Sequence, residues 1–202
     1  MEEITKEEIS KLMEVKSQAR GVVFKTDTEY ILAEKGEEGL KKLEEELEKL
    51  GHPIKYKEIK SMEFYPAGLR ALSLLVIKKT FGFDDKKIEN MGLVATKKSI
   101  IVKLFIRFFL SLDRVFFKEA PRIWQKHWTA GELVPVELNE EKKYAILRLK
   151  NFNLHPLYCS VYLQGYFAGI LQMLIKSPEM SCQETKCSFK GGEYHEYLIK
   201  WQ

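Results

Sequence analysis

The sequence predicts an α+β fold, in which N-terminal helices pack on a four-stranded antiparallel sheet and a long helix lies between two hairpins. Three patterns predict it. Apolar residues recur with helical spacing up to about residue 128, polar and apolar residues alternate in the last third of the chain, and an apolar helical stretch over 157–175 separates two pairs of such segments. No repeat or linker divides the chain, so we expect an appendage at 1–20 and one domain over 21–202.

The first two predicted helices depend on capping residues. Near the N-terminus, Thr5 and Glu8 have the spacing of a capping box, which is typical of a helix start. A second helix is expected to begin at a cap formed by Asp27 or Thr28 and to end at Gly36.

Three further helices are bounded by glycine and proline. Residues 37–50 predict a charged amphipathic helix that ends at Gly51. Pro66 suits the first turn of the next helix, which Gly82 ends. A short helix to Met91 is expected to follow.

A long helix is predicted from Thr96. The most apolar window of the chain, residues 99–117, lies in it and contains four charged residues. Because a membrane span needs about 20 nearly uncharged residues, we expect a buried helix and no membrane insertion. Pro121 is expected to break or kink this helix.

The last third of the chain predicts two hairpins. Residues 132–138 alternate but contain Pro135, which indicates an edge strand, and residues 143–149 alternate without interruption. After the helix come two more strands, predicted over 181–189 and 194–201.

Composition limits the function classes. With 202 residues and 45% hydrophobic residues, the chain can bury a substantial core. The net charge of +4 is spread among interspersed acidic and basic residues, so no nucleic-acid partner is expected. The N-terminus lacks a secretory pattern, which predicts a cytoplasmic protein with three reduced cysteines.

The sequence lacks the common enzyme motifs. It contains no GxSxG elbow, phosphate-binding P-loop, GxGxxG turn or HExxH pair. We therefore predict a non-enzymatic protein.

The order of elements and five short segments resemble a superfamily of ligand-binding domains. Its members are haem–nitric-oxide sensor domains, 4-vinyl-reductase-like domains and the TRAPP subunits of Golgi transport, and the chain is most similar in style to a bacterial branch. The segments that carry the resemblance are residues 21–24, 83–92, 112–116, 158–160 and 187–201.

The resemblance places Phe116 where the sensor domains have the axial histidine, and Tyr162 where they have the arginine that pairs with the haem propionates. Phenylalanine cannot ligate iron, and tyrosine cannot pair with a carboxylate as arginine does. His127 lies about three helical turns beyond Phe116, which is too far to replace the axial ligand without a change of register. We therefore predict that the domain has lost haem.

The resemblance also implies a ligand cavity between the helix that carries Phe116 and the sheet. Tyr158, Ser160 and Tyr162 would hold a polar group of the ligand. The residues expected to shape the cavity are Phe116, Phe117, Tyr166 and Gly169. Two alternatives remain open: the tyrosines are a plain core or interface stripe, or Gly169 serves close packing of its helix.

A metal site is a weaker prediction. Cys182, Cys187 and His195 lie on the last two strands, where the vinyl-reductase-like members also have cysteines. On a regular strand, residues five apart point to opposite faces, so a shared zinc ion would need a bulge. Buried thiols with a surface histidine are favoured over zinc, and no cofactor is expected.

Together these patterns predict a sensor or regulatory domain that binds a small apolar molecule. The alternative is a TRAPP-like interaction scaffold without a ligand, which would act as a homodimer or dock on a partner protein.

Overall fold

A computed structural model describes residues 4–98, 111–175 and 177–202. Its main sheet has four antiparallel strands in the order β3-β4-β6-β5. The strands are β3 (Glu132–Asn139), β4 (Tyr144–Lys150), β5 (Met180–Lys186) and β6 (Tyr194–Trp201). The predicted α+β fold, its two hairpins and its edge strand at Pro135 are thereby confirmed. Beside Pro135 the pairing of β3 with β4 shifts by one residue, a bulge that tolerates the missing N–H.

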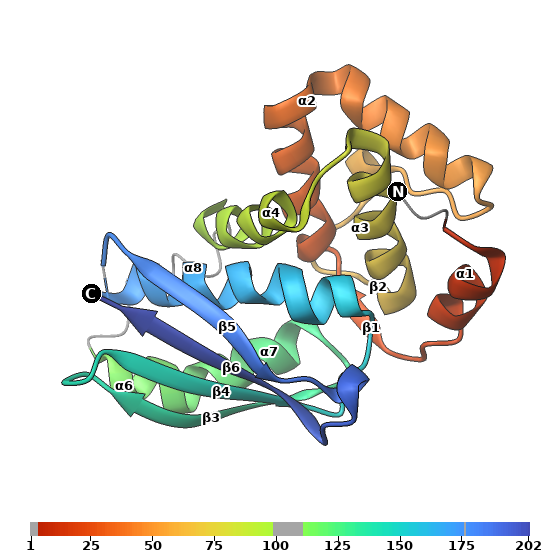
Figure 1. The fold of residues 1–202 in the computed structure, drawn as a ribbon. Helices are drawn as coiled ribbons and strands as arrows, with labels where there is room; N and C mark the ends of the chain where they lie inside the picture. The colour runs from red at the N-terminus through yellow and green to blue at the C-terminus, as the bar shows by residue number, and fades with distance from the viewer. Residues whose placement is uncertain (1–3, 99–110, 176) are drawn as a thin grey trace.

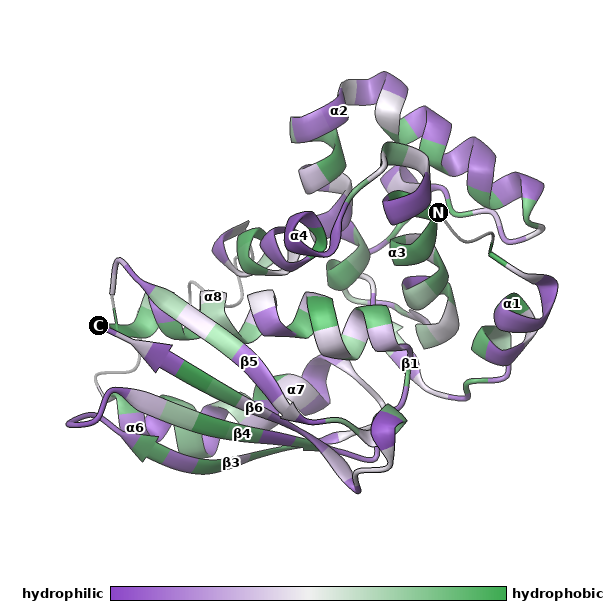
Figure 2. Cartoon of the chain, in the orientation of Figure 1, coloured by the Kyte–Doolittle hydropathy of each residue, from purple (hydrophilic) through white to green (hydrophobic). Residues whose placement is uncertain are grey.

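The alternation along the strands decides which face of the sheet is covered. On β4, Ala145, Leu147 and Leu149 are buried on one face, and this face is packed against α7 (Ala120–His127) and α8 (Leu163–Ile175). Figure 2 shows the same alternation along the strands and the apolar character of α8. The helix α8 is the centre of the molecule, because the N-terminal helices reach the sheet through it.

The N-terminal segment is joined to the rest by packing and by strand pairing. Thr5 caps α1 (Lys6–Met13) by accepting a hydrogen bond from the Glu8 amide, as predicted. β1 (Gln18–Arg20) pairs with β2 (Phe64–Pro66). The helix α1 packs closely on α3 (Ala67–Phe81), since a Cβ on Gly68 would overlap the Leu12 carbonyl. The first twenty residues, predicted as an appendage, thus share the hydrophobic core of the domain.

The second and third predicted helices join into one long element, α2 (Val22–Lys49). It is kinked at Gly36, whose φ of 68° suits glycine. The predicted start at Asp27 or Thr28 is wrong, because both residues lie inside the helix and are buried. A 3₁₀ turn, η1 (Tyr56–Glu58), interrupts the connector to β2. The helix α3 starts after Pro66 and ends at Gly82 in the left-handed region, as predicted.

The next helix, α4 (Asp85–Lys98), is longer than the predicted short helix and packs across α8. Three glycines allow the approach. A Cβ on Gly165 would overlap the Glu89 carbonyl oxygen, one on Gly92 would overlap that of Tyr162, and one on Gly169 would lie 2.8 Å from that of Leu93. The two helix backbones are therefore in direct contact.

The predicted buried helix over 99–117 falls largely outside the described residues, since 99–110 are not described. After them come a short helix, α6 (Leu112–Arg114), and a π-helical turn, η2 (Val115–Glu119), which leads into α7. Pro121 lies at the start of α7, where it has no N–H to leave unpaired. The helical backbone thus continues through Pro121, and the irregularity before it is the π turn η2 instead of a break.

A second π turn, η3 (Leu157–Tyr162), opens α8, and a 3₁₀ turn, η4 (Ser188–Lys190), lies between β5 and β6. β5 therefore ends earlier than the predicted 181–189. None of the described helices is both long and apolar enough to span a membrane.

Candidate functional site

An apolar cavity of about 50 Å³ lies between α7, α8 and the sheet. Phe116, Trp124 and His127 border it on one side, and Leu147 and Phe167 border it on the other. A second hollow of about 30 Å³ adjoins it and shares Trp124, His127, Trp128 and Tyr166 with it. This space lies between helix and sheet, where the resemblance places a ligand cavity.

The tyrosines of the predicted stripe border the smaller hollow. Tyr158, Tyr162 and Tyr166 recur every four residues, and all three line it, together with Thr26. The rings of Tyr158 and Tyr162 are stacked at 5.1 Å, and Trp128 meets Tyr158 edge-on at 5.4 Å. Burial raises the pKa of each of these three hydroxyls, so they remain neutral donors and acceptors.

His127 contributes a polar group to both hollows. Its Nδ1 is 2.8 Å from the carbonyl oxygen of Ile123. A carbonyl only accepts, so Nδ1 carries the proton. Burial lowers the pKa of His127, the Ile123 hydrogen bond opposes this shift without cancelling it, and Arg20 and Lys126 each lower the pKa by smaller amounts. The ring is therefore neutral, and Nε2 is an unprotonated acceptor.

A buried ion pair supports the tyrosines from behind. Arg70 and Asp27 are both 0% exposed, with Nη1–Oδ2 and Nη2–Oδ1 distances of 2.7 and 3.0 Å. The guanidinium carbon of Arg70 lies 5.3 Å from the ring centre of Tyr158 and 4.8 Å from that of Tyr162. A cation from α3 therefore faces the tyrosines, although Tyr162 itself replaces the arginine expected by resemblance.

The remaining predicted residues separate into distinct places. Phe116 is buried and borders the cavity, whereas Phe117 is 39% exposed and is not among the residues that line it. Gly169 lies against Leu93 and Thr96 of α4, which supports the alternative of close helix packing. Ser160 points to the other side of α8, where its Oγ is 3.6 Å from the Cys187 Sγ.

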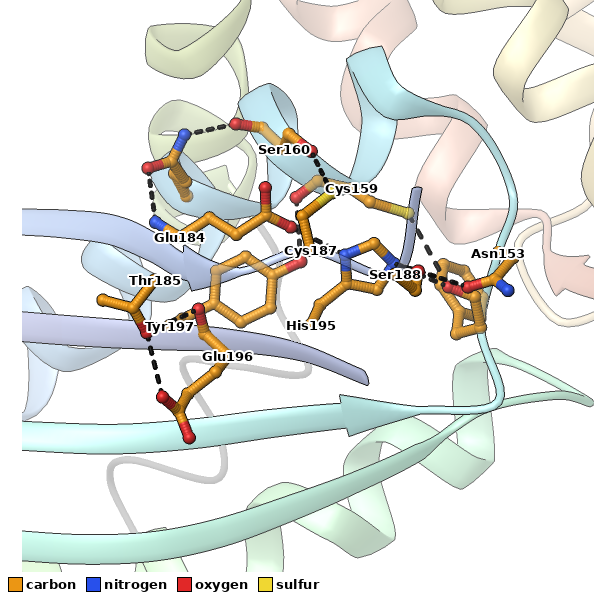
Figure 3. Close-up of polar contacts among 12 residues, drawn as sticks. Asn153, Cys159, Ser160, Glu184, Thr185, Cys187, Ser188, His195, Glu196 and Tyr197 are labelled. Carbon is orange, nitrogen blue, oxygen red and sulfur yellow. Dashed lines mark hydrogen bonds and ion pairs between the residues drawn. The ribbon is translucent and has the colours of Figure 1, made fainter. Parts of the chain in front are cut away.

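A second polar site lies on the terminal hairpin (Figure 3). Ligating atoms of Glu184, Cys187 and His195 lie within 4.8 Å of one another. His195 is 0% exposed, and its Nδ1 is 2.7 Å from the Glu184 Oε1. Cys182, the other predicted ligand, is not in this group, which corrects the predicted set: Glu184 takes its place.

A bulge in β5 explains why these side chains meet. The pairing of β5 with β6 shifts between Glu184 and Lys186, so Thr185 is the extra residue. The bulge puts Cys187 on the same face as Glu184, although residues three apart on a regular strand point to opposite faces. No local pattern in the sequence indicates this bulge.

The hairpin site resembles a Ser-His-Glu triad but cannot act as one. The Nε2 of His195 is 3.1 Å from the Phe152 carbonyl oxygen, which only accepts, and 2.7 Å from the Ser188 Oγ. Nε2 therefore carries a proton and cannot remove one from Ser188. The Ser188 hydroxyl instead donates to the Asn153 Oδ1 at 2.6 Å.

The fold is shared with solved H-NOX domains, whereas no protein-family model and no curated protein match the sequence. An H-NOX protein from S. oneidensis in the Fe(II)NO ligation state gives a TM-score of 0.67 at 14% identity, covering 91% of this chain and 99% of that chain. A mutant of the H-NOX protein from K. algicida, Fe(II) and unliganded, gives 0.63 at 10% identity, with 91% and 96% covered.

A third H-NOX structure, solved to probe heme distortion, gives a TM-score of 0.62 at 16% identity over 91% of this chain and 95% of that chain. Similarity at these identities establishes the fold, not the activity. The expected haem-sensor-like fold is thereby confirmed. The likeness to vinyl-reductase-like and TRAPP-like proteins stays a prediction.

The residues around the cavity do not fit a porphyrin. Pockets for drug-sized ligands occupy roughly 300–1,000 Å³, and the cavity between the described residues has about 50 Å³. The buried ring of Phe116 lies at the edge of the cavity, and its centre is 5.1 Å from the ring centre of Phe117. The space suits a molecule of a few heavy atoms.

Proposed function

We propose that this chain is a non-enzymatic sensor or regulatory domain that does not use haem. It binds a very small, largely apolar molecule in the cavity between α7, α8 and the sheet. The observation that carries the proposal is the cavity itself. Its walls are apolar, yet the neutral His127 borders it and the adjoining tyrosines provide hydroxyls. Binding sites combine apolar walls with a few placed polar groups in this way.

The proposed ligand follows from size and charge. A cavity of about 50 Å³ exceeds the roughly 10–15 Å³ that one water needs. Its neutral lining disfavours ions, because moving an unpaired charge out of water costs several kcal/mol or more. A molecule with one hydrogen-bond donor or partial positive charge would match the unprotonated Nε2 of His127.

Signalling through this cavity requires a second state of the domain. The cavity lies between α7 and α8, and both helices also pack on the sheet. A ligand that fits one spacing of these helices better than another would shift the population towards it. The magnitude of the shift is set by the difference in affinity for the two states.

Xenon is a suitable probe, because it enters dry apolar cavities without specific chemistry. We expect amide NMR signals of α7 and α8 to shift saturably as xenon pressure rises. The variant I170F, which adds a ring at a lining position, should lose the effect. The matched control I175F places the same ring at the end of α8, outside the lining residues, and should keep it.

Native mass spectrometry and the visible spectrum of the purified protein complete the test. A small bound mass, or xenon binding that I170F abolishes, supports the proposal. A Soret band would overturn the haem-free part of it. An apo mass together with no xenon effect would overturn the ligand-binding function, and a dimer in the same spectrum would favour the interaction scaffold.

A further inference from the structure

The hairpin site, which the proposed function does not use, has the features of a metal centre. Its three ligating atoms are a carboxylate oxygen, a thiol sulfur and an imidazole nitrogen, contributed by Glu184, Cys187 and His195. All three side chains are buried or nearly so, and His195 is 0% exposed. Glu184 and Cys187 are separated by two residues, the short spacing that zinc sites use for one ligand pair.

We propose that Glu184, Cys187 and His195 bind a zinc ion. Zinc accepts mixed sulfur, nitrogen and oxygen ligands, whereas calcium and magnesium prefer oxygen alone. Ligand atoms around tetrahedral zinc lie about 3.3–3.8 Å apart, as bond lengths of about 2.0–2.3 Å require. The ligating atoms now lie within 4.8 Å of one another, so side-chain movements of about 1 Å would bring them to that spacing.

The surroundings of His195 prepare its Nδ1 for a metal. Ligating histidines almost always donate their other ring N–H to a carbonyl or carboxylate, which fixes the tautomer. Here Nε2 meets the Phe152 carbonyl oxygen at 3.1 Å and the Ser188 hydroxyl at 2.7 Å, and Ser188 is held in turn by Asn153. The Nδ1 of His195 therefore faces the Glu184 carboxylate, and a metal ion would replace the proton shared by this nitrogen and the carboxylate oxygen.

Cys187 is held in position by its backbone. Its carbonyl oxygen accepts hydrogen bonds from the amides of Lys190 and Gly192, at 3.1 and 3.0 Å. A Cβ on Gly192 would lie only 2.9 Å from that oxygen, so this turn needs glycine. The thiol is thus presented by a rigid turn, as ligands of preformed sites are.

Ser160 lies between this site and the protein surface. The Ser160 Oγ lies 3.6 Å from the Cys187 Sγ. Ser160 also lines a surface groove of about 980 Å³ between α1, α3 and η3. A metal could enter from this groove, and its fourth ligand would be water or the Ser160 hydroxyl.

The test is metal titration of the full chain after chelation. We expect one Zn²⁺ per chain, with release of protons from the site in weak buffer. Co²⁺ should give the ligand-field bands of a tetrahedral site and a thiolate-to-cobalt charge-transfer band. C187S should abolish the charge-transfer band, whereas the matched control C182S, which alters a buried thiol outside the site, should retain it.

Two further variants at the other proposed ligands keep the test decisive if C187S does not fold. E184Q and H195Q should each weaken Zn²⁺ binding by more than the roughly 10–100-fold that loss of an outer-shell partner costs, and S188A should fall within that range. The proposal is overturned if the wild type binds less than one equivalent, if its Co²⁺ complex lacks the thiolate band, or if E184Q binds as tightly as the wild type.

Discussion

At the scale of single residues, the buried pair of Asp27 and Arg70 has the largest expected effect on stability. Both side chains are 0% exposed, and each is the other's counter-charge. Removing one partner of a buried pair leaves an uncompensated charge and costs about 3–5 kcal/mol. We expect R70M to lower the free energy of unfolding in urea by about this amount.

The double variant D27L/R70M tests the cause. Replacing both charges with apolar side chains should recover most of the loss, because no unpaired charge remains. The exposed pair of Lys57 and Glu37, at 2.7 Å, is the control, and E37Q should change stability by at most about 1 kcal/mol. Equal losses in R70M and the double variant would contradict the explanation.

His127 predicts a pH dependence of stability. Its pKa is lowered by burial, so below its ordinary value of 6.5 the unfolded chain binds a proton that the folded chain does not. The free energy of unfolding should therefore fall as pH decreases from 6.5 towards the folded pKa, and this contribution should be constant above 6.5. Urea unfolding at a series of pH values measures it.

The variant H127Q should lose this component of the slope, and H52Q, which changes a histidine away from the cavity, should retain it. The charged groups that act on His127 are Arg20 and Lys126, and both disfavour its protonation. A slope that H127Q leaves unchanged would show that other groups cause it.

The sequence identified part of each site. Tyr158, Tyr162 and Phe116 were found, because the resemblance named their positions. His127 was set aside as an axial ligand because it lies about three turns beyond Phe116, yet both residues border one cavity, which extends along the helix from η2 to the end of α7. Arg70 gave no signal at all, because an arginine within an apolar helix pattern does not reveal its partner Asp27, 43 residues earlier.

At the scale of elements, the crossing of α4 and α8 depends on glycine. A Cβ on Gly165 would overlap the Glu89 carbonyl oxygen, which is backbone and cannot yield. A Cβ on Gly169 would meet the Thr96 hydroxyl first, which can rotate, and the Leu93 carbonyl oxygen only at 2.8 Å. The packing cost of alanine should therefore be larger at Gly165.

We expect G165A to be less stable than G169A by about 1–3 kcal/mol, the range for overpacking. Both positions lie in α8, so the gain in helix propensity, about 1 kcal/mol, is nearly the same and cancels in the comparison. Thermal and urea unfolding of the two variants provide the measurement. Equal stability would mean that α4 moves freely away from α8.

Elements with strong periodic or capping signals were predicted well, and short ones were missed. The helix ending at Gly82 and the strand β4 follow from local patterns. β1 and β2 are three residues each and exist only because distant segments pair, which no local pattern indicates. The bulge at Thr185 depends likewise on pairing with β6, and it is the feature that brings Cys187 to Glu184.

At the scale of the whole molecule, the order of elements predicted the fold class but not the layers. The sequence indicated helices against a sheet. That α8 lies between the N-terminal helices and the sheet depends on the glycine contacts with α4 and on the apolar faces of α8. Such three-dimensional complementarity is absent from the periodicity of any single segment.

This central helix also connects the two sites. The π turn η3 at its start carries Tyr158 and Tyr162, which border the smaller hollow, and between them Ser160, which touches Cys187. The Tyr197 hydroxyl donates to the Cys159 carbonyl oxygen at 2.8 Å and ties this turn to β6. We expect a change at one site that moves η3 to alter the other.

We accordingly expect zinc to change xenon binding. Zinc should shift the amide NMR signals of η3 and alter the xenon affinity of the cavity, and by thermodynamic reciprocity xenon should change the zinc affinity by the same factor. Y197F removes the hydrogen bond to the Cys159 carbonyl oxygen but keeps the ring that stacks on His195 and replaces no proposed ligand, so it should reduce this factor while both molecules still bind. Independent binding in the wild type, with a factor of one, would show that η3 is rigid and that the two sites act separately.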